Sequence, residues 1–469
     1  MAQRDELPGE DLTRRRFLRS AAVAGGLALA GPRIVRAEVR RAEPLHVALV
    51  GAGIQGRRLL MDCLKIGGVR FQAVCDVWER NRMYGARLLR KYKHPARDYE
   101  DDRDMLAAEK DLDAVLIATP DWVHAPQTIR ALQGGLHVYC EKEMSNDLAQ
   151  AREMVLAARR TGKRLQIGHQ RRSNPRYHQV LDYIDRRRVC GRITYVFAQW
   201  NRGKYLTRSV NPAHAMDPAL LKRTGYDTLE RLRNWRYYRK FSGGTMADLG
   251  SHQVDVLNWF LHARPKAVMA AGGADHIRGL EWYDNIMALY EWDYELDGKT
   301  TTVRGHYQAC STSGHGGYAE TFMGPAGSIT ISEHTDLGCI RREPDAPESD
   351  WEKRLEHDKR ALVAEAVRKA KASGEPGGSG RGGGKCNCMI GPSISATRVR
   401  HYPPVPRSDR PTTEHAPHLE NFFAAVRDEN VKLNCPAEVA YETAVSVLRA
   451  NDAVAAGRRV MFAPEDFRV

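Results

Sequence analysis

Short apolar runs alternate with amphipathic stretches in the part of the chain that follows residue 43. The apolar runs have the length of buried strands, and the stretches between them place apolar residues at helical spacing. The predicted strands are 45–50, 70–75, 113–118, 136–140 and 165–168, and the predicted helices are 57–66, 81–92, 125–133 and 149–160. This alternation predicts a doubly wound parallel sheet over residues 44–168, with its ligand at the carboxyl ends of the strands.

Beyond residue 168 the pattern changes to β-rich segments with partial alternation and with turn residues between them. These segments are 192–200, 267–272, 284–295, 300–310 and 328–332. They predict a separate α+β domain over residues 169–342, built on an open, mostly antiparallel sheet with one face covered. The fold class is therefore α/β, a doubly wound domain followed by an α+β domain.

Two further segments complete the predicted organisation. Residues 343–410 form an insertion with a charged helical stretch at 351–372, and seven of the eleven residues at 374–384 are glycine, which is typical of a linker or loop tip. Residues 411–469 contain two closing amphipathic helices, which the sequence assigns to neither domain. These helices are 418–426 and 437–455.

The first predicted strand runs directly into a glycine-rich turn and then into a helix. The turn reads Gly51-Ala52-Gly53-Ile54-Gln55-Gly56. In the Rossmann arrangement such glycines allow a tight turn, a close approach of pyrophosphate and close packing of helix on strand, and the helix N-terminus attracts the phosphates. We predict a dinucleotide site here; the alternative is a turn with a purely structural role.

The second predicted strand ends at Asp76, twenty residues beyond Gly56. A carboxylate at this point accepts hydrogen bonds from both ribose hydroxyls and repels a 2′-phosphate. The sequence therefore favours NAD over NADP as the cofactor.

Composition excludes several classes of protein. The chain has 469 residues, of which 42% are hydrophobic, enough for buried cores, and its nine cysteines are too sparse for a disulfide scaffold. The net charge of +14 raises the alternative of a nucleic-acid binder. The basic residues are spread out, without an Arg stripe or interleaved aromatics, so we expect no nucleic-acid partner.

Residues 1–37 have the pattern of a targeting segment. Arginines 14–16 and Phe17-Leu18 precede the apolar stretch 21–30, and small residues surround a cleavage point near Ala37. Paired arginines before Phe-Leu resemble the twin-arginine type of signal, which predicts a periplasmic or secreted protein that folds before export and needs no disulfides. Its removal takes away seven Arg and four acidic residues and leaves a charge of about +11.

The alternative to this signal is a basic N-terminus that stays in the cytoplasm. No run of about 18 apolar residues occurs in the chain, so we expect no stable membrane anchor.

A polar cluster in the second domain offers candidate chemistry. Asp248 and His252 are four residues apart at the start of a predicted helix, so they would share one face, and a carboxylate there could orient the imidazole and raise its basicity as a general base requires. The alternatives are a helix cap beside a structural histidine, or a metal site with Asp255 as a ligand. No convergent His/Cys spacing supports a metal, so we predict none.

Four ordered motifs together resemble the Gfo/Idh/MocA oxidoreductases, a family that includes inositol dehydrogenases and glucose–fructose oxidoreductase. The resemblance covers roughly residues 44–332. The motifs are the 51–56 turn, Ala118-Thr119-Pro120-Asp121-Trp122-Val123-His124, Glu141-Lys142 and Asp248-x-Gly-x-His252.

This resemblance implies a hydride-transfer site between the domains. Lys142 matches the family's active-site lysine, and Asp248 and His252 match its catalytic pair, with His252 as the proton acceptor from a sugar hydroxyl. Arg172 matches a segment that lines the site. The implied cofactor contacts are Gly51, Gly53, Ile54, Gln55, Gly56, Asp76, Thr119, Pro120, His124 and Glu141. A carbohydrate substrate is implied, and we expect a homo-oligomer through the C-terminal sheet.

The chain departs from the family pattern at Glu143, where the family usually has proline, a residue that fixes the local backbone and permits a cis peptide bond. Glutamate keeps the lysine but loosens its placement, or adds a carboxylate to the pocket as a substrate contact. The 343–410 insertion has no family counterpart, and its Cys386-Asn387-Cys388 is a weak metal signal.

Export would require the enzyme to carry its NAD and to regenerate it in place. We therefore expect an oxidoreductase acting on a sugar or polyol with tightly bound NAD. An NAD-dependent glycosidase or epimerase that oxidises its sugar transiently is the first alternative, and a nucleotide-binding sensor or scaffold without turnover is the second. Retention of Lys142, Asp248 and His252 favours the oxidoreductase.

Overall fold

The computed structural model describes residues 43–203, 207–334, 337–354, 400–402 and 414–469. Residues 44–469 form one compact unit. The signal expected at 1–37, most of the helical stretch at 351–372, the glycine-rich segment and Cys386-Asn387-Cys388 lie outside the described residues.

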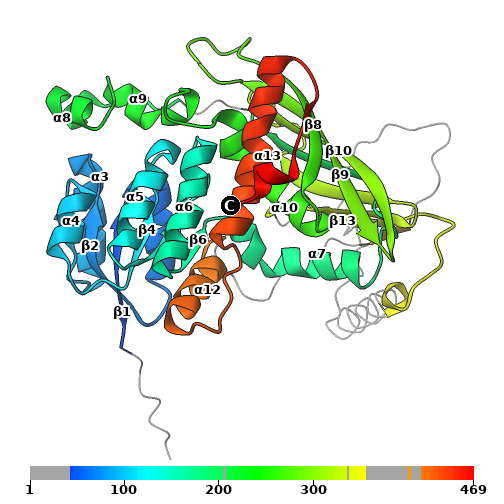
Figure 1. The fold of residues 1–469 in the computed structure, drawn as a ribbon, viewed down its shortest axis with the longest axis horizontal. Coiled ribbons are helices and arrows are strands. Elements are labelled where there is room, and N and C mark those ends of the chain that lie inside the picture. Colours follow the sequence, from blue (N-terminus) through cyan, green and yellow to red (C-terminus); the bar gives the residue numbers. More distant parts are fainter. Residues whose placement is uncertain (1–42, 204–206, 335–336, 355–399, 403–413) are drawn as a thin grey trace, which may run out of the picture. The chain divides into compact units, whose positions relative to one another are not determined.

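A parallel sheet of six strands forms the N-terminal domain, as the alternating pattern predicted (Figure 1). Its strand order is β3-β2-β1-β4-β5-β6. Successive strands are thus added on one side of β1 up to β3 and on the other side from β4 onward, and all of them are parallel. The elements are β1 (Leu45–Val50), α2 (Ile54–Cys63), β2 (Val69–Cys75), α3 (Glu79–Lys91), β3 (Arg97–Tyr99), α4 (Asp102–Ala108), β4 (Ala114–Ile117), α5 (Asp121–Gln133), β5 (His137–Cys140), α6 (Leu148–Thr161) and β6 (Leu165–Ile167). The sequence did not predict β3 and α4, because neither segment has an apolar run.

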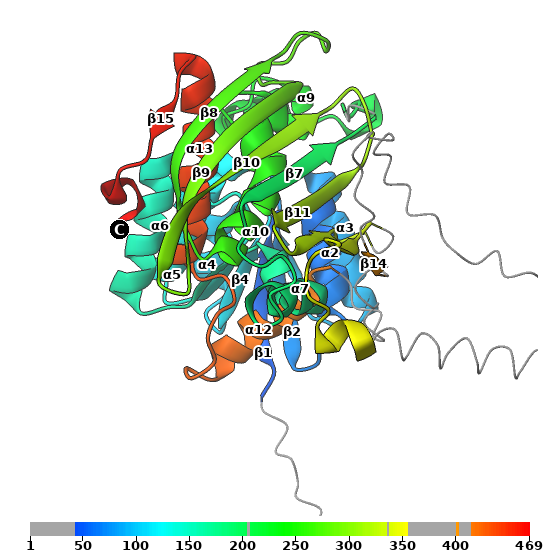
Figure 2. The same cartoon turned by 90° about the vertical axis from the view of Figure 1, so that its right-hand side faces the viewer.

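A sheet of nine strands forms the second domain, and only its β7–β10 pair is parallel (Figure 2). The strand order is β14-β13-β12-β11-β7-β10-β9-β8-β15. The strands are β7 (Tyr195–Asn201), β8 (Pro265–Gly273), β9 (Asn285–Leu296), β10 (Lys299–Cys310), β11 (Tyr318–Gly324), β12 (Gly327–Ile331), β13 (Cys339–Arg342), β14 (Arg400–Tyr402) and β15 (Val460–Met461). The predicted fold class, a Rossmann domain followed by a mostly antiparallel α+β domain, is confirmed.

Helices cover one face of this sheet. The covering helices are α7 (Pro175–Asp185), α10 (Ser251–Leu261) and α13 (Ala437–Ala456), which contact β12, β11 and β8 respectively. Side chains along β9 alternate between buried and exposed, as expected for a sheet with one covered face.

The two closing helices connect the domains. In α12 (Ala416–Arg427), Leu419, Phe422 and Phe423 join the core of the first domain. Helix α13 packs against α6 of the first domain and against β8 and α10 of the second. These helices therefore belong to the core on which the site between the domains is built.

Residues 207–242, here called the cap segment, cross from the second domain to the carboxyl ends of the parallel strands. The segment contains α8 (Pro218–Arg223) and α9 (Leu229–Arg233) (Figure 1). Trp78 Nε1 donates to the His214 carbonyl at 3.0 Å, and Trp122 Nε1 donates to the Tyr226 hydroxyl at 2.8 Å. The cap segment thus has its own small apolar core over the edge where a dinucleotide would bind.

The seven described cysteines are all unpaired, and six of them are buried. Among the described residues, no helix has the length and apolar character needed to cross a membrane.

Candidate active site

A single cleft of 1440 Å³ joins the glycine-rich turn, the start of α10 and the cap segment. The first domain contributes Gly51, Gly53, Asp76 and Lys142 to its lining, and the second contributes Asp248, His252, Trp200 and Arg236.

The glycine turn has the shape of a phosphate cradle. A Cβ atom at Gly51 would lie 2.6 Å from the Ala118 carbonyl oxygen, and one at Gly56 would lie 1.8 Å from the Gly51 carbonyl oxygen, so neither position accepts a side chain. Gly53 faces open space, and it precedes α2 without any side-chain cap. The free N–H groups of this helix N-terminus therefore face the cleft and fit a bound pyrophosphate.

Asp76 lies in the cleft at the end of β2, where its carboxylate is held from three sides. It accepts hydrogen bonds from the backbone N–H groups of Ala52 and Trp78, both at 2.8 Å, and from Asn81 Nδ2 at 3.3 Å. Burial raises the pKa of Asp76 to about 6, so the group is mostly ionised at pH 7. A fixed anion at this place fits ribose hydroxyls and disfavours a 2′-phosphate.

Replacing Asp76 with asparagine is expected to shift the cofactor preference toward NADP by about 10-fold or more, because the repelling charge is lost while the side-chain shape is kept. Titration of cofactor-free protein with NAD and with NADP measures the ratio of the two affinities. The matched control is Asp297→Asn, which removes an equal charge from a side chain that is 73% exposed. An unchanged ratio in D76N would show that Asp76 does not face the ribose.

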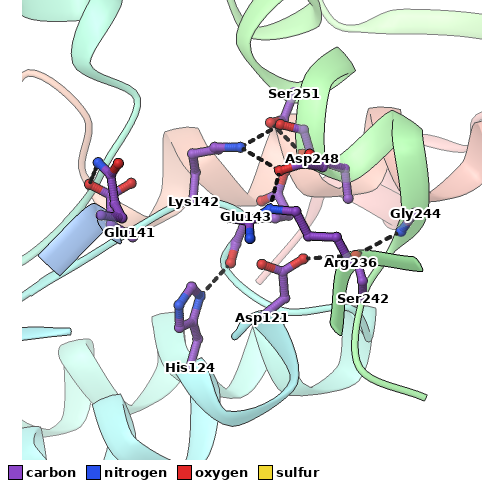
Figure 3. A network of polar contacts seen from close by, with 12 residues as sticks. Asp121, His124, Glu141, Lys142, Glu143, Arg236, Ser242, Gly244, Asp248 and Ser251 are labelled. Atoms are coloured by element: carbon purple, nitrogen blue, oxygen red, sulfur yellow. Dashed lines mark hydrogen bonds and ion pairs between the residues drawn. The ribbon is translucent and has the colours of Figure 1, made fainter. Parts of the chain in front are cut away.

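Lys142 and Asp248 meet across the domain boundary (Figure 3). Lys142 Nζ lies 3.7 Å from Asp248 Oδ1 and donates a hydrogen bond to the Asp248 backbone carbonyl. Arg236, from the cap segment, donates from Nε to the same Oδ1 at 2.9 Å. Burial by itself would raise the pKa of Asp248, but Arg236 and Lys142 hold it far below 3.8, so this group stays ionised.

His252 lies one turn beyond Asp248 and beside Trp200, with ring centroids 5.5 Å apart. Burial lowers the pKa of His252 well below 6.5, and the nearby charge of Lys142 adds to this shift. The imidazole is therefore neutral at ordinary pH and can accept a proton.

One expectation for this pair is wrong, since Asp248 does not orient His252. Residues Met246–Gly250 form a π-helical turn ahead of α10, which changes the helical spacing, and Arg236 binds the Asp248 carboxylate. The Nδ1 atom of His252 is buried without a hydrogen-bond partner in the described part of the chain. Asp248 acts on Lys142 and Arg236 instead, and burial makes His252 a weaker base than free imidazole.

Thr119 and Pro120, predicted as cofactor contacts, line the cleft, but the prediction for His124 is wrong. The His124 ring lies below the cleft between the carbonyl oxygens of Thr119 and Glu143, each 2.7 Å from a ring nitrogen. It is 1% exposed, and burial lowers its pKa to about 4. His124 therefore supports the backbone beside Lys142 and does not contact a ligand.

Ile54, Gln55 and Glu141 also line the cleft. Gln55 Nε2 donates to Glu141 Oε1 at 3.0 Å and lies 2.9 Å from His415 Nε2. This contact ties the turn after β1 to the end of β5 and to the residue before α12.

The two substrate contacts suggested by sequence are also wrong. Arg172 lies outside the cleft lining; its Nε is 2.9 Å from both carboxylate oxygens of the buried Asp255, which also accepts a hydrogen bond from Thr443. Glu143 is fully buried behind Lys142, and its Oε1 accepts a hydrogen bond from the Met144 backbone N–H at 2.8 Å. The Lys142–Glu143 peptide bond is cis. Both side chains turn into the core, where their partners are.

Several cleft residues were not found from the sequence. Arg236 and Trp235 belong to the cap segment, and Trp200, Arg202 and Tyr318 come from the ends of β7 and β11. The run of arginine and aromatic residues at 233–238 was the available signal. No group of three or more His, Cys, Asp or Glu residues suited to a metal occurs among the residues that the structure describes.

Comparison with known families decides the identity of both domains. The family described as "Oxidoreductase family, NAD-binding Rossmann fold" matches residues 45–169, and the "GFO/IDH/MocA C-terminal domain" matches residues 222–329. Both domains match the Gfo/Idh/MocA oxidoreductase family. Its first domain is an NAD-binding domain, which confirms the cofactor predicted from the glycine turn.

Proteins similar to this chain carry the names of several dehydrogenases and oxidoreductases. Inositol 2-dehydrogenase of Salmonella typhimurium is 29% identical over 229 residues, which cover 48% of this chain and 56% of that protein. The chain thus spans about half the length of the curated relatives that it matches. Levoglucosan dehydrogenase in complex with NADH has a TM-score of 0.62 at 15% identity, covering 90% of this chain and 100% of its own. Aldose–aldose oxidoreductase of Caulobacter crescentus, complexed with glycerol, has a TM-score of 0.62 at 17% identity with the same coverage. The two structures show a shared fold.

Proposed function

We propose that this protein oxidises a sugar or polyol by hydride transfer to NAD held in the cleft. The observation that carries the proposal is the convergence of Lys142, Asp248 and His252 on the cleft that also contains the glycine turn and Asp76. The relatives named as inositol and aldose oxidoreductases support a polyhydroxylated substrate.

The residues divide the reaction between them. When bound, NAD supplies a carbon that accepts a hydride, that is, one hydrogen with two electrons, from the substrate C–H bond. Neutral His252 accepts the proton of the adjacent hydroxyl, and the C–O bond becomes a carbonyl. Lys142 stabilises the oxygen as negative charge develops on it, Asp248 holds the lysine in place, and Arg236 fixes the Asp248 carboxylate.

We further propose that NAD stays bound through turnover and that the protein is exported with it. The cap segment supports retention, because its apolar core spans Trp78 after β2 and Trp122 in α5 and covers the dinucleotide edge. The pattern of residues 1–37 supports twin-arginine export, which carries folded proteins. Retained NAD has to be regenerated by a second substrate or by return of the hydride.

Purification of the mature protein tests these proposals. We expect nicotinamide absorbance and fluorescence to co-purify with the protein and sugars from a panel to change the redox state of the cofactor. Stable reduction by a free sugar or polyol supports the oxidoreductase. Release of an aglycone from a glycoside without net reduction would indicate the transient-oxidation alternative, and bound NAD that no sugar changes would indicate a sensor.

We also propose that copies associate through the uncovered face of the nine-stranded sheet. Met269, Met287 and Leu289 on β8 and β9, with Met461 on β15, are between 46% and 58% exposed and lie on neighbouring paired strands. Such an apolar row on a sheet face supports a partner surface. Analytical ultracentrifugation measures the oligomeric state, and a monomer at micromolar concentration would contradict the proposal.

A further inference from the structure

The cleft carries more positive charge around Asp248 than its acidic groups balance. Lys142, Arg202, Arg208 and Arg236 all line it. Lys142 and Arg236 share the single carboxylate of Asp248. Within the described ranges, neither Arg202 nor Arg208 forms an ion pair. Two guanidinium groups are therefore left without a counter-ion beside the reacting groups.

Arg208 is held in this position by its backbone. Asn234, which is 5% exposed, accepts a hydrogen bond from the Arg208 N–H at 2.8 Å and donates to the Arg208 carbonyl at 3.1 Å. Arg233 donates to the Ser209 carbonyl. The same short stretch of the cap segment that supplies Arg236 thus fixes Arg208, so the two side chains enter the cleft from one rigid support.

Arg202 enters from the end of β7. Its backbone N–H donates to the Cys310 carbonyl at 2.7 Å, and its guanidinium lies 5.3 Å from the centre of the Trp200 ring. Its charge is among those that lower the pKa of Asp248. Arg202 is thus close to the catalytic carboxylate without being bound to it.

Arg202 and the proton acceptor both lie beside a pair of aromatic side chains. Trp200 stacks on Tyr318 with ring centroids 4.7 Å apart and planes 21° apart, and it lies 5.5 Å from the His252 ring. The nearby acid Glu333 is engaged, since it pairs with Arg171 at 3.0 Å and accepts from Gln170 at 3.0 Å. Trp200 therefore brings the Arg202 guanidinium and the His252 ring beside one aromatic side chain, 5.3 Å and 5.5 Å from its ring centre.

A partly buried charge without a counter-ion has a free-energy cost that a ligand can offset. A guanidinium cannot deprotonate in order to escape desolvation, and its planar fork matches carboxylate and phosphate oxygens. Partial burial disfavours the protonated state of Arg208 and lowers its pKa, and the neighbouring charge of Arg236 adds to this shift. An anion bound by these arginines would offset this penalty.

We propose that the substrate is a sugar carrying an anionic group, which Arg202 and Arg208 bind while His252 acts on a ring hydroxyl. This inference rests on the proposed function and narrows its substrate class from sugars to acidic sugars. A uronate carboxylate and a sugar phosphate share the required chemistry, and the experiment distinguishes them.

The test uses the mature protein with its cofactor bound. D-glucuronate, D-galacturonate, glucose 6-phosphate and the parent neutral sugars are compared by equilibrium binding and by cofactor reduction. We expect at least one acidic sugar to bind about 10-fold or more tightly than its neutral parent. Arg202→Gln and Arg208→Gln should each reduce this preference about 10-fold, and Arg208→Lys should restore part of it. Added salt should weaken the binding of acidic sugars more than the binding of neutral sugars.

Arg186→Gln is the matched control, because it removes the same charge from a side chain that is 86% exposed and outside the cleft. The inference is wrong, while the proposed function stands, if neutral sugars reduce the cofactor as well as their acidic counterparts do and if R202Q and R208Q leave the ratio of acidic-sugar to neutral-sugar affinity unchanged. Acidic sugars that bind through both arginines without reducing the cofactor would support the anion site and contradict the proposed chemistry. Loss of bound cofactor in R202Q and R208Q would assign the arginines to the dinucleotide and overturn the inference.

Discussion

Replacing either His252 or Lys142 with alanine is expected to lower kcat by about 100- to 10,000-fold while the cofactor stays bound. His252 is the neutral base beside the cleft, and general acid–base catalysis contributes a factor of this size. Lys142 lies 3.7 Å from the Asp248 carboxylate in the cleft lining, and its loss removes the charge that stabilises the developing oxyanion. Single-turnover reduction of bound NAD measures the effect directly.

The pH profile adds a second readout to this prediction. A general base works in its neutral form, and the pKa of His252 lies well below 6.5 because the ring is buried and near Lys142. We therefore expect log kcat/KM to stay flat as the pH falls through 6.5, where an unperturbed histidine would become protonated.

His276→Ala is the control, since this histidine is exposed and outside the cleft. Unchanged turnover in H252A or K142A would remove these residues from the catalytic site. Loss of bound NAD in the same variants would assign them to cofactor binding.

Replacing Glu143 with glutamine is expected to remove a large pH dependence of stability. Burial raises the pKa of Glu143 from 4.5 to about 8, so the folded protein keeps this carboxyl protonated across a range in which the unfolded chain ionises it. Below pH 4.5 both states are protonated and the group has no effect. As the pH rises from 4.5 to 8, the free energy of unfolding of the wild type falls by up to about 5 kcal/mol, and above pH 8 the loss is complete.

Glutamine does not titrate, and it can keep the hydrogen bond from the Met144 N–H. Glu143→Gln should therefore gain stability relative to the wild type between pH 4.5 and 8. Urea unfolding at pH 4.5, 6, 7 and 8.5 measures the difference. Asp297→Asn, at an exposed turn, should give a curve parallel to the wild type. If the stability curve of Glu143→Gln were also parallel to that of the wild type, Glu143 would be ionised in the folded protein.

The elements that the sequence predicted best are those specified by local patterns. The predicted strand 45–50 coincides with β1, and 70–75 lies within β2, because buried parallel strands are short apolar runs bounded by turn residues. The alternation in the second half also placed β9 within one residue of its prediction. By contrast, β3 has the sequence Arg97-Asp98-Tyr99 and exists only because its backbone pairs with β2.

The candidate site divides in the same way. The glycine turn, Asp76 and Lys142 follow strands directly, so strand order alone brings them to one edge of the sheet. The direction of a side chain is a different matter. His124 and Arg172 lie in the predicted segments, yet both turn into the core because the Glu143 carbonyl and the Asp255 carboxylate are there.

The sequence by itself therefore determined the two-domain α/β fold and the NAD turn, since each depends on residues close together in the chain, and it nominated Lys142, Asp248 and His252 as candidate site residues. Only the tertiary structure decided what surrounds them. Arg236 replaces His252 as the partner of Asp248, and Arg202 and Arg208 are left without counter-ions beside Trp200. Such groups come from the cap segment and the end of β7, and their contacts with the first domain depend on long-range packing that no local pattern records.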